Sequence, residues 1–526
     1  MTGFPLLTWQ HAERWARERP AEEAVVFGEV RIGWARLWQE IARTAAALHA
    51  AGVRPGDRIA MIAMARPEFI VSYLAAHRVG AVWVGFSPKY PLGEIARMFE
   101  SCRPVIVFSL ARYGDIDLAP LASALRARFN CVRRLVAIEA AMEGAQTWDA
   151  FAASGDGVPL PTASDDAEAP ALMIYTSGST GQPKAVVHRH CNILANVERE
   201  IAHWRMDTDT RVLLHFPINH AAASVAIGMA AVAAGSCMVM MDRFDAEATL
   251  RAVEAERITI LGQAPAMFML QLDSPLFNAD TLRSVRHFIW SGAPAPVELV
   301  RRISEICAET GAGMLTGYGA TETCGWITYT DPDADFETLS RSVGRIAAPF
   351  ELVLLDAAGA PVPRGGTGEI CVRGAFLMAG YLDNEAETRR AIDAGGFYHS
   401  GDLGREDDAG NLIITGRTNE MYKSGGEIVY PREIESVLEA EPDVLMAVVV
   451  NVPDAVFQQV GWAFVMPTEG CSPDPAALIA SCRRSLANFK VPRRILIREA
   501  LPLLAVGKLD RVRLREEARA MHAANL

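Results

Sequence analysis

The sequence has few cysteines, and none of them are arranged for cross-linking or zinc binding. Its nine Cys include no CxxC pair, the spacing typical of four-thiolate zinc sites, and their odd number does not suit a disulfide framework. Positive charge is also in deficit, because 51 Lys and Arg face 63 Asp and Glu and the formal net charge is −12. This balance disfavours nucleic acid as a partner. We therefore expect a protein of a reducing compartment, the cytoplasm.

An apolar leader is missing as well. The opening residues, MTGFPLLTWQHAERWARERP, mix Glu and Arg where a signal peptide needs a continuous apolar run. Residues 212–241 carry no Lys, Arg, Asp or Glu, and hydropathy alone would indicate a membrane span there. However, Pro217, Asn219 and His220 interrupt this stretch, and its second half is rich in Ala and Gly. We expect two strands around a buried helix, and no membrane span.

The length of the chain and its pattern of apolar and polar residues predict several domains or subdomains. A chain of 526 residues is too long for one ordinary core. Short apolar runs alternate with amphipathic stretches as far as about residue 343, which predicts βα units on parallel-rich sheets. Short strands and turns follow. We expect an α/β fold: a large N-terminal domain, residues 1–417, with two βα-layered subdomains and a small β subdomain, then a small α+β C-terminal domain, residues 418–526.

The strongest local motif is YTSGSTGQPK, from Tyr175 to Lys184. Small and hydroxylated residues let backbone N–H groups approach phosphate oxygens closely, and a lysine adds positive charge. It is not a Walker A motif, because GxxxxGK followed by Ser or Thr is absent. An ordinary Ser/Gly turn would leave Pro183-Lys184 and the apolar strand ALMIY unexplained. The predicted phosphate-binding residues are Thr176, Ser177, Gly178, Ser179, Thr180, Gly181 and Lys184.

This decapeptide closely resembles the signature of the adenylate-forming (ANL) superfamily, which includes acyl-CoA synthetases, peptide synthetase adenylation domains and luciferases. Further motifs resemble the family's in the same order: YGATE (residues 318–322), SGD (400–402), Gly416-Arg417, KSGGEIVYPREIE (423–435) and Gly507-Lys508. Each motif alone would be weak, but their agreement in order, from about residue 20 to about residue 515, is specific. The chain resembles an acyl-CoA synthetase or aryl-CoA ligase.

The resemblance assigns nucleotide contacts to particular residues. Tyr318 would line the adenine pocket, and Thr321 would contact phosphate. Glu322 would hold Mg²⁺, while Asp402 and Arg417 would bind the ribose hydroxyls. Further nucleotide-binding positions are Gly292, Ala293, Pro294 and Gly319.

The implied reaction is the attack of a carboxylate on the α-phosphorus of ATP, which gives an acyl-adenylate and pyrophosphate. Two anions must meet, so fixed cations and a metal ion have to stabilise the transition state. Glu322 for the metal, Lys184 for the outer phosphates and Lys508 for the reacting oxygens meet that requirement. The alternative for Lys508 is a solvated lysine near a chain end, but Gly507 and the upstream Leu501-Pro502 match the family.

A second step would transfer the acyl group to the thiol of coenzyme A and release AMP. In the family the C-terminal domain is mobile and rotates between the steps, about a hinge that corresponds here to Asn419, where many relatives carry Asp or Lys. The face carrying Gly425 and Gly426 would then form the pantetheine tunnel. Glycines suit a backbone that lies close to a narrow ligand, although an ordinary turn is the alternative.

The acid site is suggested by the motif FPINHAAA. His220 would lie beside the carboxylate and orient it as a cation or a hydrogen-bonding imidazole, with a buried structural histidine as the alternative. Relatives often have Gly where Ala223 stands. The family's amino-acid-activating members bind the ammonium group with an Asp, and residues 212–241 contain none. The predicted substrate-binding residues are His220, Ala221, Ala223, Gly262, Ser291, Gly317 and Trp326.

These residues favour a hydrophobic carboxylic acid that is aromatic, alicyclic or of medium chain length. Trp326 could wall the pocket or belong to the core. Several alternatives to a coenzyme A ligase stay open: an enzyme that loads the phosphopantetheine of a carrier protein, luciferase-like oxidation, and a non-catalytic binding protein on the same fold. The sequence does not choose between a monomer and a homodimer.

Overall fold

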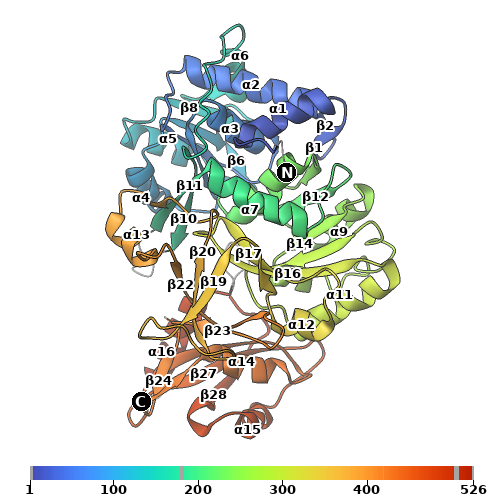
Figure 1. Ribbon diagram of the computed structural model, residues 1–526, viewed down its shortest axis with the longest axis vertical. Helices are drawn as coiled ribbons and strands as arrows, with labels where there is room; N and C mark the ends of the chain where they lie inside the picture. Colours follow the sequence, from blue (N-terminus) through green and yellow to red (C-terminus); the bar gives the residue numbers. More distant parts are fainter. Residues whose placement is uncertain (1–3, 178–182, 419, 503–508, 524–526) are drawn as a thin grey trace.

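The computed structural model describes residues 4–177, 183–418, 420–502 and 509–523 of the 526-residue chain. Figure 1 shows an elongated molecule in which residues 420–502 and 509–523 form the lower end, while the N-terminus lies within the upper half. The predicted α/β fold with parallel-rich sheets and a small C-terminal α+β unit is confirmed.

The first large sheet has eight strands in the order β21-β11-β10-β4-β3-β5-β8-β9. The strands from β10 to β9 run parallel, while β11 and β21 are added antiparallel. Its strands are β3 (Arg58–Ile62), β4 (Val82–Phe86), β5 (Ile106–Leu110), β8 (Arg134–Ile138), β9 (Gln146–Thr147), β10 (Pro170–Ser177), β11 (Pro183–Arg189) and β21 (Gly380–Tyr381).

The second large sheet has nine strands in the order β18-β17-β16-β15-β14-β12-β13-β1-β2. Its interior is parallel, and an antiparallel strand or pair closes each edge. Its strands are β1 (Glu23–Phe27), β2 (Val30–Gly33), β12 (Arg211–Leu214), β13 (Cys237–Met240), β14 (Ile260–Gln263), β15 (His287–Trp290), β16 (Gly313–Ala320), β17 (Gly325–Tyr329) and β18 (Arg345–Ile346).

Helices cover both faces of these sheets, as parallel strands require. One apolar core joins the two sheets through a central layer of α1 (Thr8–Glu18), α2 (Trp34–Ala50), α3 (Pro67–Arg78), α7 (His190–His203), the π-helix η1 (Ala222–Ile227) and α8 (Gly228–Ala234). The outer face of the first sheet packs on α4 (Leu92–Cys102) and α5 (Ala119–Arg128). The outer face of the second packs on α9 (Ala246–Ala255), α10 (Pro265–Met269), α11 (Val297–Thr310) and α12 (Phe336–Arg341).

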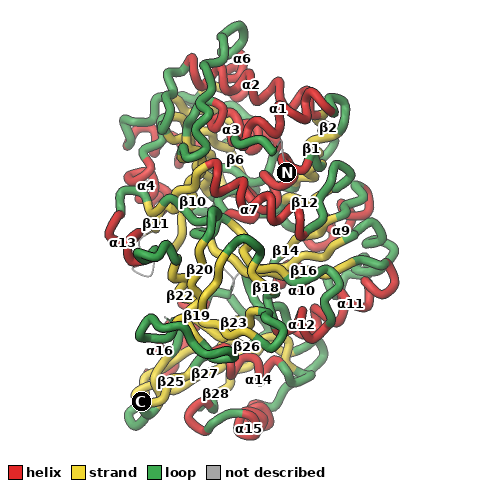
Figure 2. The backbone as a smooth tube through the Cα atoms, viewed as in Figure 1, coloured by secondary structure: helices red, strands yellow, loops and turns green. Residues whose placement is uncertain are grey.

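Two smaller units follow. The β subdomain is an antiparallel sheet of β19 (Glu351–Leu355), β20 (Gly368–Arg373), β22 (Tyr398–Glu406) and β23 (Leu412–Arg417). The C-terminal sheet is built from β24 (Tyr422–Ser424), β25 (Glu427–Val429), β26 (Val444–Asp454), β27 (Gln458–Pro467) and β28 (Arg494–Ile497). Figure 2 shows these strands at the lower end of the molecule, with helices beside them. The C-terminal helices are α14 (Pro431–Glu439), α15 (Pro475–Ser485), the short 3₁₀ helix η2 (Asn488–Lys490) and α16 (Arg511–Ala523).

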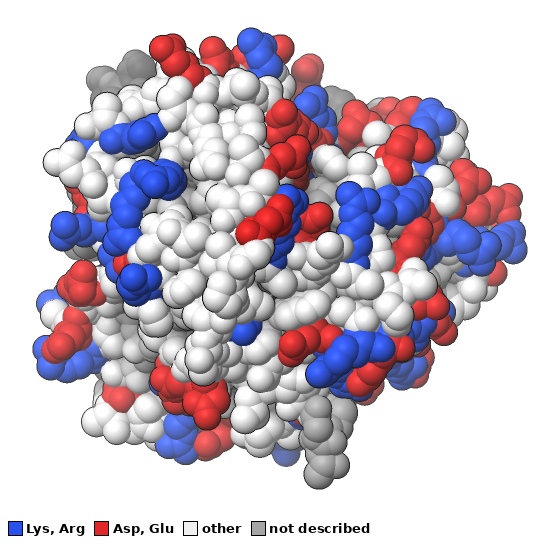
Figure 3. Space-filling model, turned by 90° about the horizontal axis from the view of Figure 1, so that it is seen from above, with Lys and Arg blue, Asp and Glu red and all other residues white. Residues whose placement is uncertain are grey.

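The remaining elements are short: α6 (Trp148–Ala153), α13 (Glu385–Ala391), and the hairpin of β6 (Arg112–Tyr113) and β7 (Ile116–Asp117). Among the described residues, no helix is long and apolar enough to cross a membrane. The stretch 212–241 forms two strands around a buried helix, as predicted, but the helix begins as a π-helix rather than a regular α-helix. On the face shown in Figure 3, basic and acidic side chains are interspersed around uncharged surface.

Candidate active site

The predicted phosphate loop joins β10 to β11 at an edge of the parallel sheet. The two strands form an antiparallel hairpin that pairs Thr176 with Lys184 and Ser177 with Pro183. Gly178, Ser179, Thr180 and Gly181, which connect the two strands in sequence, lie outside the described residues. The pairing therefore fixes the position of Lys184 near the start of β11.

Lys184 is held by partners that the sequence analysis did not single out. Its Nζ donates to Glu387 Oε2 at 2.5 Å and lies 5.2 Å from the ring centre of Tyr381. The Tyr381 hydroxyl donates to Glu322 Oε1 at 2.9 Å. Burial, followed by the charge of Glu322, raises the pKa of Tyr381, so its hydroxyl keeps the donated proton. Lys184 and Glu322, from two separate motifs, thus contact the same tyrosine.

The segment that carries Thr321 and Glu322 turns sharply between β16 and β17. A Cβ on Gly319 would lie 1.9 Å from the carbonyl oxygen of Gly325, so only glycine fits there. The Thr321 carbonyl accepts from His188 Nε2 at 2.8 Å, and the Glu322 carbonyl accepts from Met378 N at 2.9 Å. The turn is therefore anchored to neighbouring elements on both sides.

The predicted ribose-binding residues meet at a second corner. Asp402 and Arg417 are paired in register on β22 and β23, and Arg417 Nε lies 2.6 Å from Asp402 Oδ1. The other carboxylate oxygen, Oδ2, accepts from the Tyr318 hydroxyl at 2.6 Å. The charge of Asp402 raises the pKa of Arg417. Three motifs that lie far apart in the sequence therefore converge on one buried carboxylate.

Tyr398, which the sequence analysis missed, lies between the two corners. Burial raises its pKa, and the charges of Glu322 and Asp402 and the hydroxyls of Tyr381 and Tyr318 add to this effect. Tyr398 is 5% exposed. The partly buried Tyr381 and Tyr318 donate hydrogen bonds to Glu322 and Asp402, and the buried Tyr398 on β22 is close enough to feel both charges. No sequence motif marks Tyr398 or Tyr381, because their importance comes from the sheets that bring them together.

Next to this row, Glu369, Cys371 and His399 form a cluster whose ligand atoms lie within 4.8 Å of one another. Glu369 Oε1 accepts from Gly401 N at 3.0 Å, and Oε2 lies 3.0 Å from His399 Nδ1. Both carboxylate oxygens already have partners, so the cluster forms a hydrogen-bonded support for the strand that carries Asp402. We assign it no metal.

The predicted acid-binding residues gather where the parallel strands of the second sheet end. His220 precedes η1 and accepts a hydrogen bond from Ala222 N on its Nδ1 at 3.2 Å, which places the ring proton on Nε2. η1 is a π-helix, whose turns are wider than those of an α-helix: Gly228 N donates to Ala223 O, five residues back instead of four. Such π-turns are frequent at functional sites. Ala221 and Ala223 are both buried.

Small residues on neighbouring strands complete this region. A Cβ on Gly262 would meet no atom closer than Ile227 Cδ1 of η1, at 3.8 Å. The Ser291 hydroxyl donates to Gly317 O at 2.8 Å, and a Cβ on Gly317 would lie 2.4 Å from the Trp326 ring. Trp326 also packs edge-on against Trp204 at 5.3 Å, so it both covers Gly317 and joins the core. Gly292, with φ +86°, begins the turn that carries Ala293 and Pro294 after β15.

Gly425 and Gly426 form the two-residue turn of the β24–β25 hairpin. Their φ values are +61° and +92°, as a tight hairpin of this kind requires. Gly425 N donates to Phe457 O at 2.9 Å, and the Arg493 guanidinium lies 4.7 Å from the Phe457 ring. The tight hairpin therefore accounts for the conformation of both glycines, and their contact with pantetheine stays a prediction.

The predicted hinge residue Asn419 and the predicted catalytic Lys508 lie outside the described residues. The segments beside them are well anchored. Thr418 N donates to Gly401 O at 2.8 Å, and Arg511, at the start of α16, makes two hydrogen bonds to Glu435, at 2.6 and 2.9 Å.

The sequence analysis also missed Glu200 of α7, which is 0% exposed. The sequence did contain a sign that Glu200 would be buried. It lies at helical spacing from apolar residues and shares one face of α7 with Ile193, Asn196 and Val197. The hypothetical Cβ of Gly325 would lie 2.8 Å from Glu200 Oε1. Glu200 therefore contacts the strand that begins one residue before Trp326.

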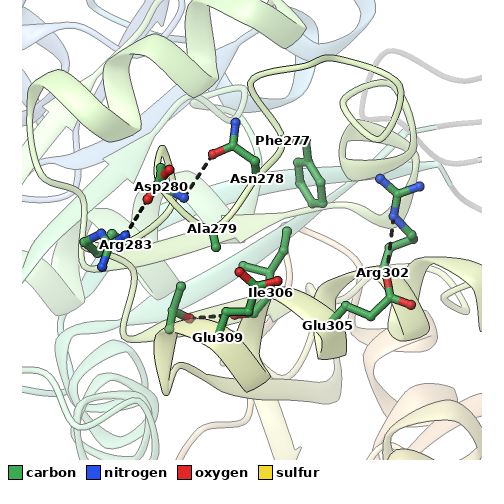
Figure 4. A pocket seen from close by; sticks show the side chains of 10 residues that line it. Phe277, Asn278, Ala279, Asp280, Arg283, Arg302, Glu305, Ile306 and Glu309 are labelled. Carbon is green, nitrogen blue, oxygen red and sulfur yellow. Dashed lines mark hydrogen bonds and ion pairs between the residues drawn. The ribbon is translucent and has the colours of Figure 1, made fainter.

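A separate cavity of about 330 Å³ lies beside α11, on the outer side of the second sheet. Figure 4 shows two pairs of oppositely charged side chains in its lining. Arg283 pairs with Asp280, and Arg302 lies 3.9 Å from Glu305. Because these charges compensate each other, the cavity offers no evident recognition chemistry for an ionic ligand.

Comparisons with known proteins identify the family of this chain. Residues 12–382 match the AMP-binding enzyme family, and residues 433–508 match the AMP-binding enzyme C-terminal domain. A 3-[(3aS,4S,7aS)-7a-methyl-1,5-dioxo-octahydro-1H-inden-4-yl]propanoyl:CoA ligase of Mycobacterium tuberculosis is 34% identical over 509 residues, which cover 96% of this chain and 97% of that protein. A feruloyl-CoA synthase of an Amycolatopsis species is 31% identical over 499 residues, covering 94% and 96% of the two chains.

A solved structure agrees as well. ATP-bound MatB from Rhodopseudomonas palustris is similar with a TM-score of 0.86 and 28% identity, over 97% of this chain and 99% of MatB. The predicted resemblance is therefore confirmed along nearly the whole length. The chain belongs to the family of AMP-binding enzymes.

Proposed function

We propose that the protein is an ATP-dependent, AMP-forming acid–CoA ligase. A carboxylate attacks the α-phosphorus of ATP, which forms the acyl-adenylate and releases pyrophosphate. The thiol of coenzyme A then attacks the adenylate carbonyl, and AMP leaves. The observation that carries this proposal is the convergence of Tyr318, Asp402 and Arg417 on one corner and of Lys184, Glu322 and Tyr381 on another.

In this proposal the two corners bind opposite ends of ATP. The Asp402 carboxylate exchanges its contacts with Tyr318 and Arg417 for the ribose hydroxyls, and Tyr318 borders the adenine. Lys184, the loop 177–181 and Thr321 contact the phosphates. Positive charge and N–H donors placed before the reaction stabilise the charge that develops in the transition state.

Glu322 fits a role in holding magnesium. Mg²⁺ prefers oxygen ligands and is bound by one or two carboxylates together with substrate phosphates. Glu322 offers a carboxylate close to the residues proposed for the phosphates, and Tyr381 orients it. The ion would neutralise phosphate charge as the carboxylate approaches.

His220 orients the acid. Since Nδ1 accepts from Ala222 N, the Nε2–H group is the donor that the ring can offer to a substrate carboxylate. Of the two roles expected from the sequence, this geometry supports the hydrogen-bonding imidazole. Lys508 then contacts the reacting oxygens, and after rotation about Asn419 the turn at Gly425-Gly426 borders the pantetheine arm.

The acid is proposed to be hydrophobic and aromatic, alicyclic or of medium chain length. The lining supports this, because Ala221, Ala223, Gly262 and Trp326 offer no formal charge. The names of the similar enzymes point the same way, since one is a ligase for an alicyclic propanoyl group and another a feruloyl-CoA synthase.

The test is AMP formation from ATP with a panel of benzoates, cyclic carboxylates, fatty acids and amino acids, each with and without coenzyme A. We expect turnover that depends on coenzyme A with one group of hydrophobic acids. Pyrophosphate exchange without this dependence would indicate a carrier protein as the acceptor instead. The Asp402→Asn variant should weaken ATP binding about tenfold or more, because a charge-assisted hydrogen bond is lost.

A further inference from the structure

The helix α13 places a carboxylate on the lysine that the proposed function assigns to the phosphates of ATP. Lys184 Nζ lies 2.5 Å from Glu387 Oε2, and the two side chains are only 17% and 23% exposed. α13 directly follows β21, which pairs with β11, and the register places Tyr381 opposite Val186, two residues after Lys184. In Figure 1, α13 lies beside β10 and α4 at the edge of the first sheet.

The position of Glu387 is set by the start of its helix. Asn384 caps α13 and accepts from Glu387 N at 3.1 Å, which directs the first turn toward β11. Its neighbour Glu385 lies on the exposed side and pairs with Arg389 at 3.5 Å. Of these two glutamates in the first turn, only Glu387 contacts Lys184.

Glu387 has a second cationic partner. Its Oε1 pairs with Arg390, whose side chain is 76% exposed, while its Oε2 pairs with Lys184. The hydrogen bond from Lys184 lowers the pKa of Glu387, so the carboxylate is ionised at neutral pH. If Lys184 turned toward a phosphate, Arg390 would still partner the carboxylate. Lys184 can therefore change partner without leaving Glu387 unpaired.

We propose that Glu387 is a built-in counter-ion that competes with the outer phosphates of ATP for Lys184, and thereby sets the affinity of the site for ATP and for pyrophosphate. The inference rests on the proposed function, because it requires Lys184 to bind phosphate. Glu387 does not touch the reacting atoms, so it acts as a positioning residue. Its contact stabilises the empty site and lowers the net affinity for any anion that needs the same ammonium group.

The experiment measures the binding of MgATP and of magnesium pyrophosphate to the full-length protein by calorimetry, without the acid substrate. Glu387→Gln should tighten both about threefold to tenfold, as expected when a partly buried competing ion pair is removed. Glu387→Ala should have the same effect, since it also removes the charge. The matched control is Glu385→Gln, which removes an equal charge from the same helix turn and should leave both affinities unchanged.

Two further readouts separate competition from a structural role. In a Lys184→Ala background, Glu387→Gln should no longer alter ATP affinity, because the contested cation is gone. In steady state, Glu387→Gln should lower the KM for ATP while the kcat of adenylation changes less than about twofold. A glutamate that merely held α13 in place would instead weaken ATP binding when replaced.

The binding of ATP and pyrophosphate to the wild-type protein separates a failure of the counter-ion proposal from a failure of the proposed function. If the wild-type protein bound neither ATP nor pyrophosphate, the proposed function itself would be contradicted. If the wild-type protein bound both and Glu387→Gln left the affinities unchanged or weaker, only the competition would be overturned.

Discussion

Glu200 in the large domain and Glu435 in the C-terminal domain are both 0% exposed, yet their surroundings differ completely. Glu435 receives two hydrogen bonds from Arg511, at 2.6 and 2.9 Å, and one from Val449 N at 2.9 Å. For Glu200, the Trp326 backbone is the one group among the described residues that acts on the carboxylate as a donor, and it does not reach good hydrogen-bond geometry. The C-terminal domain thus buries Glu435 as an ionised carboxylate, and the large domain buries Glu200 as a neutral carboxylic acid.

The pKa shifts of the two glutamates have opposite signs. Burial raises the pKa of Glu200 from its ordinary value of 4.5 to about 8. Burial alone would also raise the pKa of Glu435, but the charges of Arg511 and Arg432 outweigh it, and the pKa lies below its ordinary value. The difference shows that burial by itself does not decide protonation; the nearby cations do.

The different surroundings of the two glutamates reflect the different cores of the two domains. The large domain has a continuous apolar core, within which α7 packs behind the strand that leads to Trp326. The C-terminal domain has two small apolar clusters, and the Arg511–Glu435 pair ties α16 to α14. This ion pair therefore anchors the helix that begins three positions after the proposed catalytic lysine, Lys508.

The largest effect is expected for Lys508, whose replacement should slow adenylation without weakening ATP binding. Lys508→Ala should lower the adenylation rate about a hundredfold to a thousandfold, because a preorganised positive charge at the reacting oxygens is lost. ATP binding, which is assigned to the large domain, should change little. Pyrophosphate exchange and calorimetry measure the two quantities. Lys490→Ala, which removes a lysine paired with Glu433 in the same domain, is the control; a near wild-type rate for Lys508→Ala would contradict its role.

Removing the charge of Glu435 should destabilise the C-terminal domain. Glu435→Gln leaves Arg511 without its buried counter-ion, and the loss of one partner from a buried ion pair costs about 3–5 kcal/mol. Hydrogen exchange should accelerate in α14, β26 and α16, while the large domain keeps its protection. Glu427→Gln, at an exposed position of β25, should change nothing. Equal exchange in both variants would show that the ion pair does not anchor α16.

The two glutamates should also contribute to the stability of their domains with opposite pH dependence. Because the pKa of Glu200 is raised in the folded state, its contribution is complete below about pH 4.5 and is lost as pH rises to about 8, at up to about 1.4 kcal/mol per pH unit. The pKa of Glu435 is lowered, so its contribution is present above the ordinary pKa and is lost as pH falls through the folded value.

Unfolding measured with domain-specific probes between pH 4 and pH 9 tests this expectation. Glu200→Gln should flatten the alkaline loss of stability in the large domain and leave the acid loss in the C-terminal domain in place. If Glu200→Gln and the wild-type protein showed the same alkaline slope, Glu200 would not be the titrating group. Cys324 and Tyr329 also face this position, and burial raises the pKa of both, so neither loses its proton in the folded state over this range.

The smallest effect is expected for the acid pocket. His220→Ala should raise the KM for the acid about tenfold, because one hydrogen bond to a charged group is lost, while the KM for ATP stays the same. His220→Gln, which can still donate a hydrogen bond, should recover part of the loss. Unchanged kinetics with several acids would remove His220 from the pocket.

Much of the fold and of the nucleotide site follows from local sequence patterns. The alternation of apolar and amphipathic runs predicted the parallel-rich sheets, because periodicity is a property of each segment. The motifs at Tyr318, Asp402 and Arg417 predicted residues that the structure brings into contact. The prediction of a buried helix after His220 did not include its π-helical start, which depends on Gly228 fitting against Ala223.

The sequence by itself determined the family, the order of the elements and the chemical types of the candidate site residues, because these are encoded in local spacing and composition. Only the tertiary structure decided which charges face each other. Glu387 meets Lys184, Tyr381 meets Glu322, and Glu435 meets Arg511 although 59 to 203 positions separate the members of these pairs. The physical reason is that contacts of this kind depend on how sheets and helices pack, and the protonation of a buried group depends on those contacts.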